Sequence, residues 1–386
     1  MDVDLAIVGA GLAGAALARA ARGLSVALVA EQAGARAPAP PGFDSRVYAI
    51  TPGNAAFLAA LGAWQRLDPL RVTPVRAMRV FGDDARAGLE FDAYRAGVAE
   101  LAWIVEDGAL QAALREALAG AEGVRVLAPE RLERLEITPG VARLHLRGAR
   151  TLDARLVVGA DGAHSLVRDQ AGIAATDAAY AQRAVVANFS CERVHRHTAY
   201  QWFQGGPVLA LLPLPGDHVS MVWSTGEEDA GRLLALEPQA LCDAVAAASG
   251  HVLGAMGLVS APRAFPLRRL LARRMVVPRV ALVGDAAHVV HPLAGQGANL
   301  GLQDARALAA ALAAREPMRD PGDLRLLRRY ERARAADVGM MDATVHGLYR
   351  LFGSQTRAFV TLRNAGLNLT DRLPVIKNLL IRQAMA

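Results

Sequence analysis

Three glycines near the amino terminus have the spacing of a nucleotide-binding turn. Gly9, Gly11 and Gly14 follow the pattern G-x-G-x-x-G. In this pattern the first glycine permits a tight turn, the second lets a pyrophosphate approach the backbone, and the third allows a helix to pack closely on a strand. The start of the following helix adds free N–H groups and partial positive charge. The binding residues predicted here are Gly9, Ala10, Gly11, Leu12, Ala13 and Gly14.

The elements around this turn are suited to position it. Val3–Val8 and Ser25–Ala30 are apolar runs typical of buried parallel strands, and Ala15–Arg22 between them is predicted to be a helix. Glu31 follows Gly9 by 22 positions, where a carboxylate can accept hydrogen bonds from a ribose diol. A lone glycine pattern also occurs in ordinary turns, but the strand, helix and acidic residue together favour a nucleotide site.

A second motif, Gly159-Ala160-Asp161-Gly162, follows the predicted buried strand Leu152–Val158. It therefore lies at a carboxyl end of the sheet, where open α/β sheets bind their ligands. From the spacing alone, we interpret Asp161 as a local cap of this turn.

A third motif, Gly284-Asp285, follows the apolar run Val276–Val283, which we predict to be one buried strand. Asp285 at the strand end can bind a ligand hydroxyl. The glycines after it let backbone N–H groups face outward at the start of a helix predicted over Gly297–Ala314. Such a nest of N–H groups stabilises negative charge on a neighbouring group.

The composition excludes several classes of protein. The 386 residues are 53% hydrophobic with a net charge of +6, so the chain can bury a core. Lys377 is the single lysine, and no stretch interleaves basic with aromatic residues as a nucleic-acid surface does. Cys191 and Cys242 rule out a disulfide scaffold and suit a reducing compartment. We expect no metal site and assign packing or orienting roles to His288 and His291.

The sequence pattern also predicts more than one domain. Strand-like runs separated by turn residues dominate from about Ala184 to Pro266, which predicts a sheet-rich second domain. Before it, Thr51-Pro52 is typical of a helix start, and Asp107 is predicted to cap a helix that runs to about Ala119. Val75–Phe81 and Leu89–Asp92 alternate as antiparallel strands do.

No run of about 20 apolar residues is long enough to span a membrane, and we predict a cytoplasmic protein. The carboxyl-terminal stretch Ala343–Ala386 nevertheless holds six basic residues against Asp371 alone, with apolar residues between them. Two interpretations stay open for this stretch. It forms a helical cover on the fold, or it contacts an anionic bilayer or a partner that holds a lipid-like substrate.

The three motifs, in this order and at these separations, resemble the flavoprotein aromatic hydroxylases of the p-hydroxybenzoate hydroxylase fold. The details resemble more closely the ubiquinone-biosynthesis hydroxylases of the UbiH/UbiF/VisC type. The resemblance covers essentially the whole chain. It rests on the stretches Asp44-Ser45-Arg46, Leu211–Leu214, Gly284–His288, His291–Leu302 and Leu362–Leu367.

The resemblance implies an α/β fold. It has a Rossmann-like FAD-binding domain of the GR2 type, an inserted sheet-rich substrate domain, and C-terminal helices. The expected boundaries are residues 1–74, 100–183 and 267–340 for the FAD-binding domain, 75–99 and 184–266 for the substrate domain, and 341–386 for the C-terminal helical region.

The resemblance also implies roles for individual residues. The glycine turn would hold the ADP part of FAD, Glu31 the adenosine ribose, and Asp285 the ribityl chain. Arg46 would lie near the flavin, and Asp161 would support the FAD and nicotinamide region, which replaces its interpretation as a mere cap. The loop after Asp285 would face the flavin ring through Pro292, Gly295 and Gly297, the candidate catalytic segment. The full late set is Gly284, Asp285, Pro292, Gly295, Gln296, Gly297, Ala298 and Asn299.

The activity implied is an FAD-dependent, NAD(P)H-consuming monooxygenase that takes dioxygen as co-substrate. It would hydroxylate the aromatic ring of a polyprenylated phenol in ubiquinone biosynthesis, by way of a flavin C4a-hydroperoxide, at the membrane surface or within a biosynthetic complex. Two alternatives stay open: a flavin-dependent reductase or oxidase of the same fold, and a non-catalytic FAD-binding subunit of such a complex.

Overall fold

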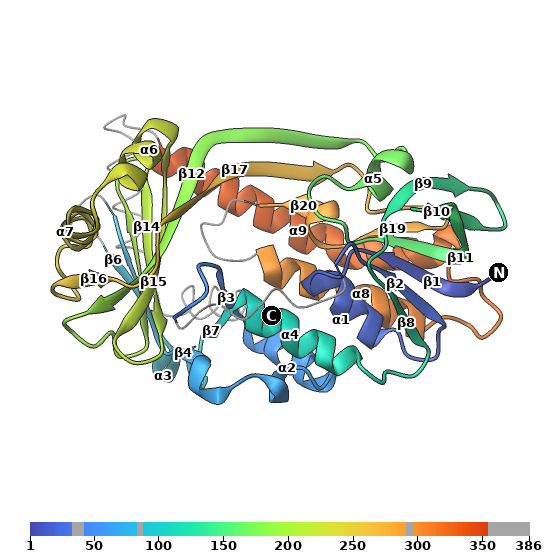
Figure 1. Ribbon diagram of the computed structural model, residues 1–386, viewed down its shortest axis with the longest axis horizontal. Coiled ribbons are helices and arrows are strands. Elements are labelled where there is room, and N and C mark those ends of the chain that lie inside the picture. The colour runs from blue at the N-terminus through green and yellow to red at the C-terminus, as the bar shows by residue number, and fades with distance from the viewer. Residues whose placement is uncertain (33–41, 83–87, 291–296, 354–386) are drawn as a thin grey trace.

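The computed structural model describes residues 1–32, 42–82, 88–290 and 297–353. Residues 33–41, 83–87, 291–296 and 354–386 lie outside the described residues. Two large sheets stand at opposite ends of the molecule, and long elements connect them (Figure 1). A small third sheet and several helices lie between the large ones.

The first large sheet contains the glycine turn and has the order β18-β19-β11-β1-β2-β8. Its central strands are parallel, because β1 pairs in parallel with both β11 and β2. The carboxyl ends of β1, β11 and β19 therefore meet at one edge. The strands are β1 (Val3–Val8), β2 (Val26–Val29), β8 (Val124–Leu127), β9 (Leu132–Ile137), β10 (Ala142–Leu146), β11 (Arg150–Gly159), β18 (Val276–Val277) and β19 (Val280–Leu282).

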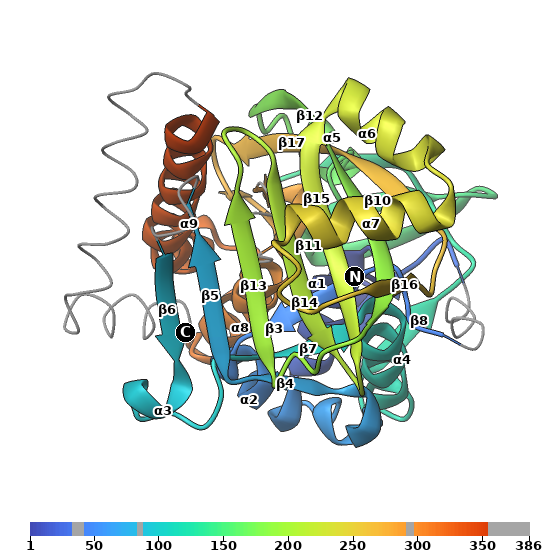
Figure 2. The same ribbon diagram turned by 90° about the vertical axis from the view of Figure 1, so that its left-hand side faces the viewer.

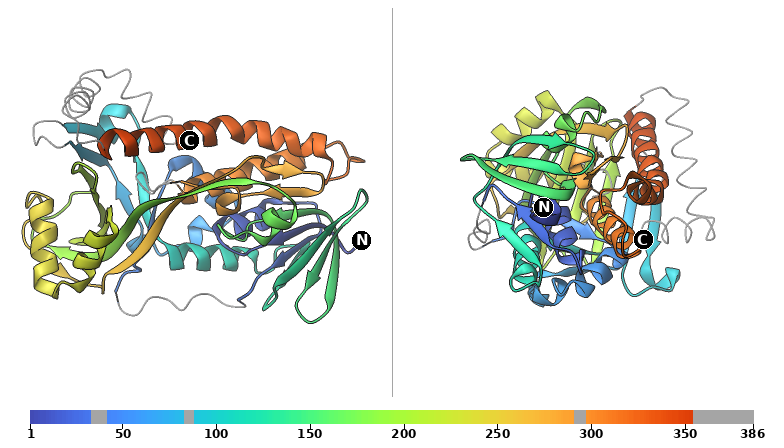
Figure 3. Two further views of the ribbon diagram at one scale, coloured as in Figure 1. Left: turned by 90° about the horizontal axis from the view of Figure 1, so that it is seen from above. Right: turned by 90° about the vertical axis from the view of Figure 1, so that its right-hand side faces the viewer.

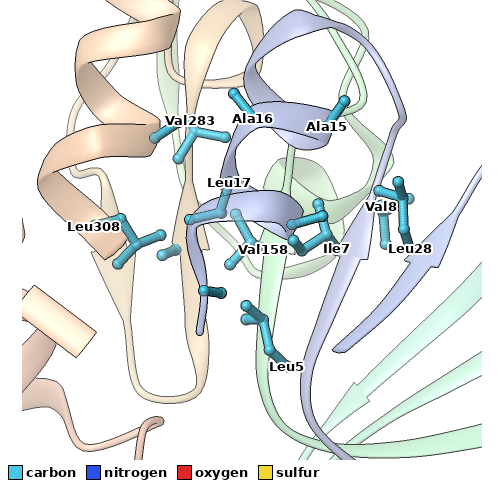
Figure 4. Close-up of a cluster of buried hydrophobic side chains, with 14 of the residues drawn as sticks. Leu5, Ile7, Val8, Ala15, Ala16, Leu17, Leu28, Val158, Val283 and Leu308 are labelled. Atoms are coloured by element: carbon cyan, nitrogen blue, oxygen red, sulfur yellow. The ribbon is translucent and has the colours of Figure 1, made fainter. Parts of the chain in front are cut away.

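Helices α1 (Leu12–Ala20), α4 (Asp107–Leu118) and α8 (Gly297–Ala313) cover this sheet. Figure 4 shows Leu5 and Ile7 of β1 and Val158 of β11 packed with Leu17 of α1 and Leu308 of α8. All five side chains are fully buried. Burial of each such side chain is worth about 1.5–3 kcal/mol, so the strand–turn–helix unit has a rigid base.

The predicted single strand Val276–Val283 is wrong. The run forms two short antiparallel strands, β18 and β19, joined by a turn at Pro278 and Arg279. Pro278 has no N–H to donate to a sheet, and Arg279 adopts a left-handed φ of +62°. The Arg279 guanidinium fixes the turn, because it donates to the carbonyls of Pro139 and Arg155 and pairs with Asp320.

The second large sheet has the order β20-β17-β12-β15-β14-β13-β5-β6, with β16 beside β12. Helices α6 (Glu227–Ala235) and α7 (Pro238–Ala248) cover one face (Figure 2). The strands are β5 (Ala77–Phe81), β6 (Gly88–Asp92), β12 (Ala175–Cys191), β13 (Thr198–Phe203), β14 (Val208–Leu214), β15 (His218–Gly226), β16 (Met256–Leu258), β17 (Arg263–Ala272) and β20 (His288–Val289).

Two long strands of this sheet, β12 and β17, extend toward the other end of the molecule (Figure 1). They continue through the boundaries expected at residues 183/184 and 266/267. Their pairing shifts register between Ala179 and Arg183, where Ala181 has a left-handed φ of +51°. A bulge of this kind bends a strand pair and strengthens its twist, so the ribbon can change direction between the two sheets.

The small third sheet has the order β3-β7-β4, and the long helix α9 runs along the length of the molecule (Figure 3). Tyr330 of α9 donates to the carbonyl of Leu282 in the first sheet, and Asp342 pairs with Arg269 of the second. Within the described residues, no helix is long and apolar enough to cross a membrane. The remaining elements are β3 (Val47–Ile50), β4 (Thr73–Val75), β7 (Ala102–Glu106), α2 (Pro52–Ala60), α3 (Ala93–Ala96), α5 (Leu166–Gln170) and α9 (Leu324–Gly353), with short 3₁₀ turns at Trp64–Arg66, Pro69–Arg71 and Gly284–Ala286.

Candidate active site

The first two motifs pack directly on each other at the carboxyl edge of the first sheet. Gly9 has a left-handed φ of +106°, and a Cβ there would lie 2.2 Å from the carbonyl oxygen of Ala160. A Cβ at Gly14 would lie 2.0 Å from the carbonyl oxygen of Gly9. Both positions therefore exclude any side chain, as expected for the tight turn and the close helix–strand packing.

The third motif joins the same cluster through small residues. A Cβ at Gly284 would meet the Cβ of Ala13 at 3.3 Å, and a Cβ at Gly301 would meet the Cα of Gly284 at 3.3 Å. The Gly284 turn, the start of α1 and the first turns of α8 thus fit together only because all three contact residues are small. Segments more than 270 positions apart form one wall.

Three exposed residues, Gly11, Asp285 and Arg46, fit an anionic dinucleotide. A Cβ at Gly11 would meet nothing within 4 Å, and no side chain caps the start of α1. Its first N–H groups are therefore available to a phosphate. Asp285 is the one exposed residue in the otherwise buried run 280–288, and Arg46 is exposed as well. These residues fit FAD: the N–H groups at the start of α1 can bind its phosphates, Arg46 supplies a positive charge, and Asp285 can accept a hydrogen bond from a hydroxyl group.

Arg46 and Asp285 interact electrostatically, although 239 positions separate them in the sequence. Burial alone lowers the pKa of Arg46, but Tyr48, Asp107, Asp285 and Asp44 outweigh that effect and raise it. The pKa of Asp285 is raised because surrounding protein desolvates its carboxyl, while Arg46 and His288 oppose the rise. Asp285 is thus exposed as a residue, although the surrounding protein partly desolvates its carboxyl group.

A buried ionic cluster supports the Gly284 turn from beneath. Asp304 of α8 is fully buried, and its Oδ2 accepts from the Gly284 N–H at 2.9 Å and contacts His288 Nε2 at 2.6 Å. Its Oδ1 accepts from Arg334 Nε of α9 at 2.7 Å. One buried carboxylate, bonded to both His288 and Arg334, therefore sets the position of the turn that carries Asp285. His288, for which a packing or orienting role is predicted, is buried and paired in this cluster, and His291 lies outside the described residues.

Asp304 and Arg334 are not among the residues predicted from the sequence, although their positions carry a signal. Asp304 lies four residues from the buried Leu300 and Leu308 on one apolar helix face. Arg334 lies four residues from the buried Tyr330 and Val338 in the same way. A charge in the middle of an apolar helical stripe predicts a buried ion pair.

This cluster predicts a pH dependence of stability. The pKa of His288 is raised, because its ion pair with Asp304 outweighs the opposing effect of burial. The folded state then holds a proton that the unfolded state loses above about pH 6.5. We expect the free energy of unfolding to fall as the pH rises above about 6.5, by at most about 1.4 kcal/mol per pH unit.

Urea unfolding at several pH values measures this dependence, and the variant His288→Gln provides the comparison. The fall above about pH 6.5 should be smaller in the variant, because its side chain binds no proton. An identical pH profile in both proteins would contradict the assigned ion pair.

Asn299 is predicted to bind the cofactor, but its side chain is hydrogen-bonded within the protein. It is fully buried, its Oδ1 accepts from the Thr51 N–H and from Asn54 Nδ2, and its own Nδ2 donates to the carbonyl of Ala49. Its side chain therefore fixes the start of α8 to β3 and α2. A neighbouring ligand could use only its backbone.

Two other predicted residues also have protein partners. Asp161 accepts from the hydroxyl of Ser165 at 2.6 Å and from the Val167 N–H at 3.2 Å, so its carboxylate is hydrogen-bonded at the start of α5, and its predicted role in supporting FAD stays a prediction. Glu31 lies exposed at the end of β2, 3.3 Å from the guanidinium of Arg131. Gly297 and Ala298 begin α8, whereas Pro292, Gly295 and Gln296 lie outside the described residues.

Comparison with known proteins agrees with this geometry. A family model described as FAD binding domain matches residues 2–342. The 3-demethoxyubiquinol 3-hydroxylase of Escherichia coli (strain K12) is 34% identical over 99% of this chain and 98% of its own length. The chain belongs to the ubiquinone-biosynthesis hydroxylase family of FAD-binding proteins. The family also includes the ubiquinone hydroxylase UbiL of Rhodospirillum rubrum, 34% identical over 99% of this chain and 89% of that protein.

Solved structures place the family among FAD-dependent monooxygenases. PqsL of Pseudomonas aeruginosa, a probable FAD-dependent monooxygenase, superposes with a TM-score of 0.76 at 25% identity, over 95% of this chain and 100% of that one. The p-nitrophenol 4-monooxygenase PnpA of Pseudomonas putida has the same fold, with a TM-score of 0.79 at 17% identity over 99% and 98% of the two chains. The protein is thus an FAD-binding monooxygenase with the expected mixed α/β fold.

Proposed function

We propose that this enzyme hydroxylates the aromatic ring of a polyprenylated phenol in ubiquinone biosynthesis, with NAD(P)H as reductant and dioxygen as co-substrate. One observation carries the substrate class: the hydroxylase of a ubiquinol precursor in Escherichia coli aligns over 98% of its length. The relative and this chain therefore correspond over both large sheets, not over the cofactor-binding part alone.

Under this proposal the residues of the carboxyl edge bind and orient FAD, which supplies the redox chemistry when bound. The free N–H groups at Gly11 and the start of α1 hold the pyrophosphate, and Glu31 accepts from the adenosine ribose. Asp285 accepts from the ribityl hydroxyls, and Arg46 contributes a positive charge across from it. Gly297 and Ala298 present the amino terminus of α8, a partial positive charge, to the ring. Pro292, Gly295 and Gln296, which lie outside the described residues, are assigned to the same flavin-binding role by this proposal.

We also propose that different parts of the chain bind the cofactor and the substrate. Residues 1–74, 100–183 and 267–340 hold the cofactor, and residues 75–99 and 184–266 cover the substrate ring and exclude water. Support comes from the separation of the two large sheets, one of which carries every glycine motif. The face of the second sheet opposite α6 and α7 is the candidate substrate wall.

The third part of the proposal concerns the membrane. A polyprenylated substrate is held in a bilayer, and we propose that the basic, apolar carboxyl-terminal region 341–386 meets the inner membrane surface or a biosynthetic complex from the cytoplasmic side. The charge of the stretch 343–386 supports this, with six basic residues against one acidic. The described part of this region, residues 341–353, belongs to helix α9, which is anchored to both large sheets.

Labelled dioxygen tests the proposed reaction. The purified protein is supplied with FAD, NADPH or NADH, a short-chain demethoxyubiquinol and ¹⁸O₂, and the product mass is measured. We expect one ¹⁸O atom in the ring hydroxyl and nicotinamide oxidation that the phenol accelerates. Product without the label would indicate a reductase or oxidase. Bound FAD with no phenol-dependent turnover of any short-chain precursor would indicate a non-catalytic subunit.

A further inference from the structure

We propose that Tyr48 is a positioning residue that keeps the Arg46 guanidinium directed toward the proposed FAD site. The inference rests on the proposed contact between Arg46 and FAD. It adds a device made of three side chains, Tyr48, Asp107 and Gln111, none of which the glycine motifs include. We call these three residues the Arg46 platform.

The platform is built around the Tyr48 ring. The guanidinium carbon of Arg46 lies over this ring, 5.3 Å from its centroid, which is within the range of a cation–π interaction. The Tyr48 hydroxyl donates to Asp107 Oδ1 at 3.0 Å, and Gln111 Nε2 donates to the same oxygen at 2.7 Å. The ring is therefore fixed at its far end by a buried carboxylate.

This arrangement corrects the role predicted for Asp107. The helix α4 is preceded by Glu106 as its N-cap residue, and Asp107 is its first residue. Its carboxylate accepts hydrogen bonds from the side chains of Tyr48 and Gln111, and only 4% of the residue is exposed. Its backbone N–H donates to the carbonyl of Arg46 at 3.0 Å. One residue thus holds both the backbone of Arg46 and the ring beneath its side chain.

The backbone on the other side of Arg46 is held equally closely. Asp44 Oδ1 accepts from the Arg46 N–H at 3.2 Å, and Asp44 Oδ2 accepts from the Gly108 N–H at 3.1 Å. Asn188 of β12, fully buried, donates from Nδ2 to the carbonyls of Phe43 and Asp44. The segment before β3 is therefore tied to α4 and to the second sheet.

A platform matters because three carboxylates compete for one guanidinium. Asp107, Asp285 and Asp44 all attract Arg46. Without the ring, the flexible Arg46 side chain could fold back onto Asp107 or Asp44 and turn away from the proposed FAD site. The Tyr48 ring lies beneath the guanidinium, and its hydroxyl and Gln111 already occupy Asp107 Oδ1. Arg46 consequently stays exposed, with its charge available to an anionic ligand.

A double-mutant cycle on FAD affinity tests the proposal. FAD is titrated into the apoproteins of the wild type, Tyr48→Leu, Arg46→Gln and the double variant, with protein fluorescence as the signal. Cation–π contacts are worth about 0.5–2 kcal/mol, so Tyr48→Leu should weaken FAD binding about 2- to 30-fold. In the Arg46→Gln background the same change should have an effect of less than about twofold, because the guanidinium it positions is gone.

Two further variants separate positioning from general damage. Tyr48→Phe keeps the ring and should weaken FAD binding less than Tyr48→Leu. Tyr94→Leu removes a tyrosine that is 92% exposed and should leave FAD affinity unchanged. Equal losses from Tyr48→Leu with and without Arg46 would overturn the proposal, as would no loss at all. A wild-type protein that fails to bind FAD would instead refute the proposed function.

Discussion

Replacing Asp304 with alanine is expected to lower the free energy of unfolding by about 3–5 kcal/mol, because it removes the buried carboxylate that pairs with His288 and leaves the buried Arg334 with only the exposed Asp337 as a charged partner. Asp304 is fully buried and bonds the Gly284 N–H, His288 and Arg334 at once. A loss of that size is a large part of the stability of an ordinary domain. Urea unfolding monitored by circular dichroism measures it.

Asp337 provides the matched control. It pairs with the same guanidinium, at Arg334 Nη1, but its side chain is 57% exposed. An exposed pair of this kind contributes less than about 1 kcal/mol, so Asp337→Ala should be nearly neutral. Similar losses in the two variants would mean that Asp304 has no special role beneath the Gly284 turn.

The second large effect is expected at Gly11, on cofactor binding alone. A Cβ at this position meets no protein atom within 4 Å, so Gly11→Ala should fold with unchanged stability. The added methyl group would project toward the proposed pyrophosphate and remove one or two of its charge-assisted hydrogen bonds to the backbone. Each such bond is worth about 1.5–3 kcal/mol, which predicts FAD binding weaker by about 10- to 100-fold or more. Fluorescence titration of the apoprotein measures the affinity.

Gly14→Ala should behave in the opposite way. Its Cβ would lie 2.0 Å from the Gly9 carbonyl oxygen, so the damage falls on the protein itself and appears first in the melting temperature. Gly231→Ala, at an exposed glycine inside α6 with no neighbour within 4 Å, should leave FAD affinity unchanged and raise the melting temperature slightly, because alanine favours a helix more than glycine does. Unchanged FAD affinity in Gly11→Ala would mean that the phosphate lies elsewhere.

Local patterns predicted the parts of the fold that depend on near neighbours in the sequence. The unit β1–α1–β2 was predictable because apolar runs and glycines act within about 30 residues. The helix start at Thr51 was equally local: its hydroxyl accepts from the Asn54 N–H. The run 276–283 failed because apolar content alone cannot distinguish one strand from a tight hairpin, and Pro278 was the overlooked signal.

Features of the site that depend on distant partners could not be predicted in this way. Asn299 follows a glycine-rich loop, which suggested a ligand, yet its amide bonds Thr51, Asn54 and Ala49 almost 250 positions away. Nothing in the sequence near Asp107 indicates that it would hold Tyr48 rather than cap its helix. Both outcomes depend on which elements the completed sheets bring together, and a single sequence does not contain that information.

The flavin content of the purified protein tests the central claim most directly, namely that the glycine turn and the distant Gly284-Asp285 segment together bind one FAD. Apoprotein is titrated with FAD, and the bound flavin is quantified from its visible absorbance after removal of the free cofactor. We predict saturation at one FAD per chain. A protein that stays colourless at every FAD concentration, while remaining folded by circular dichroism, would contradict the account.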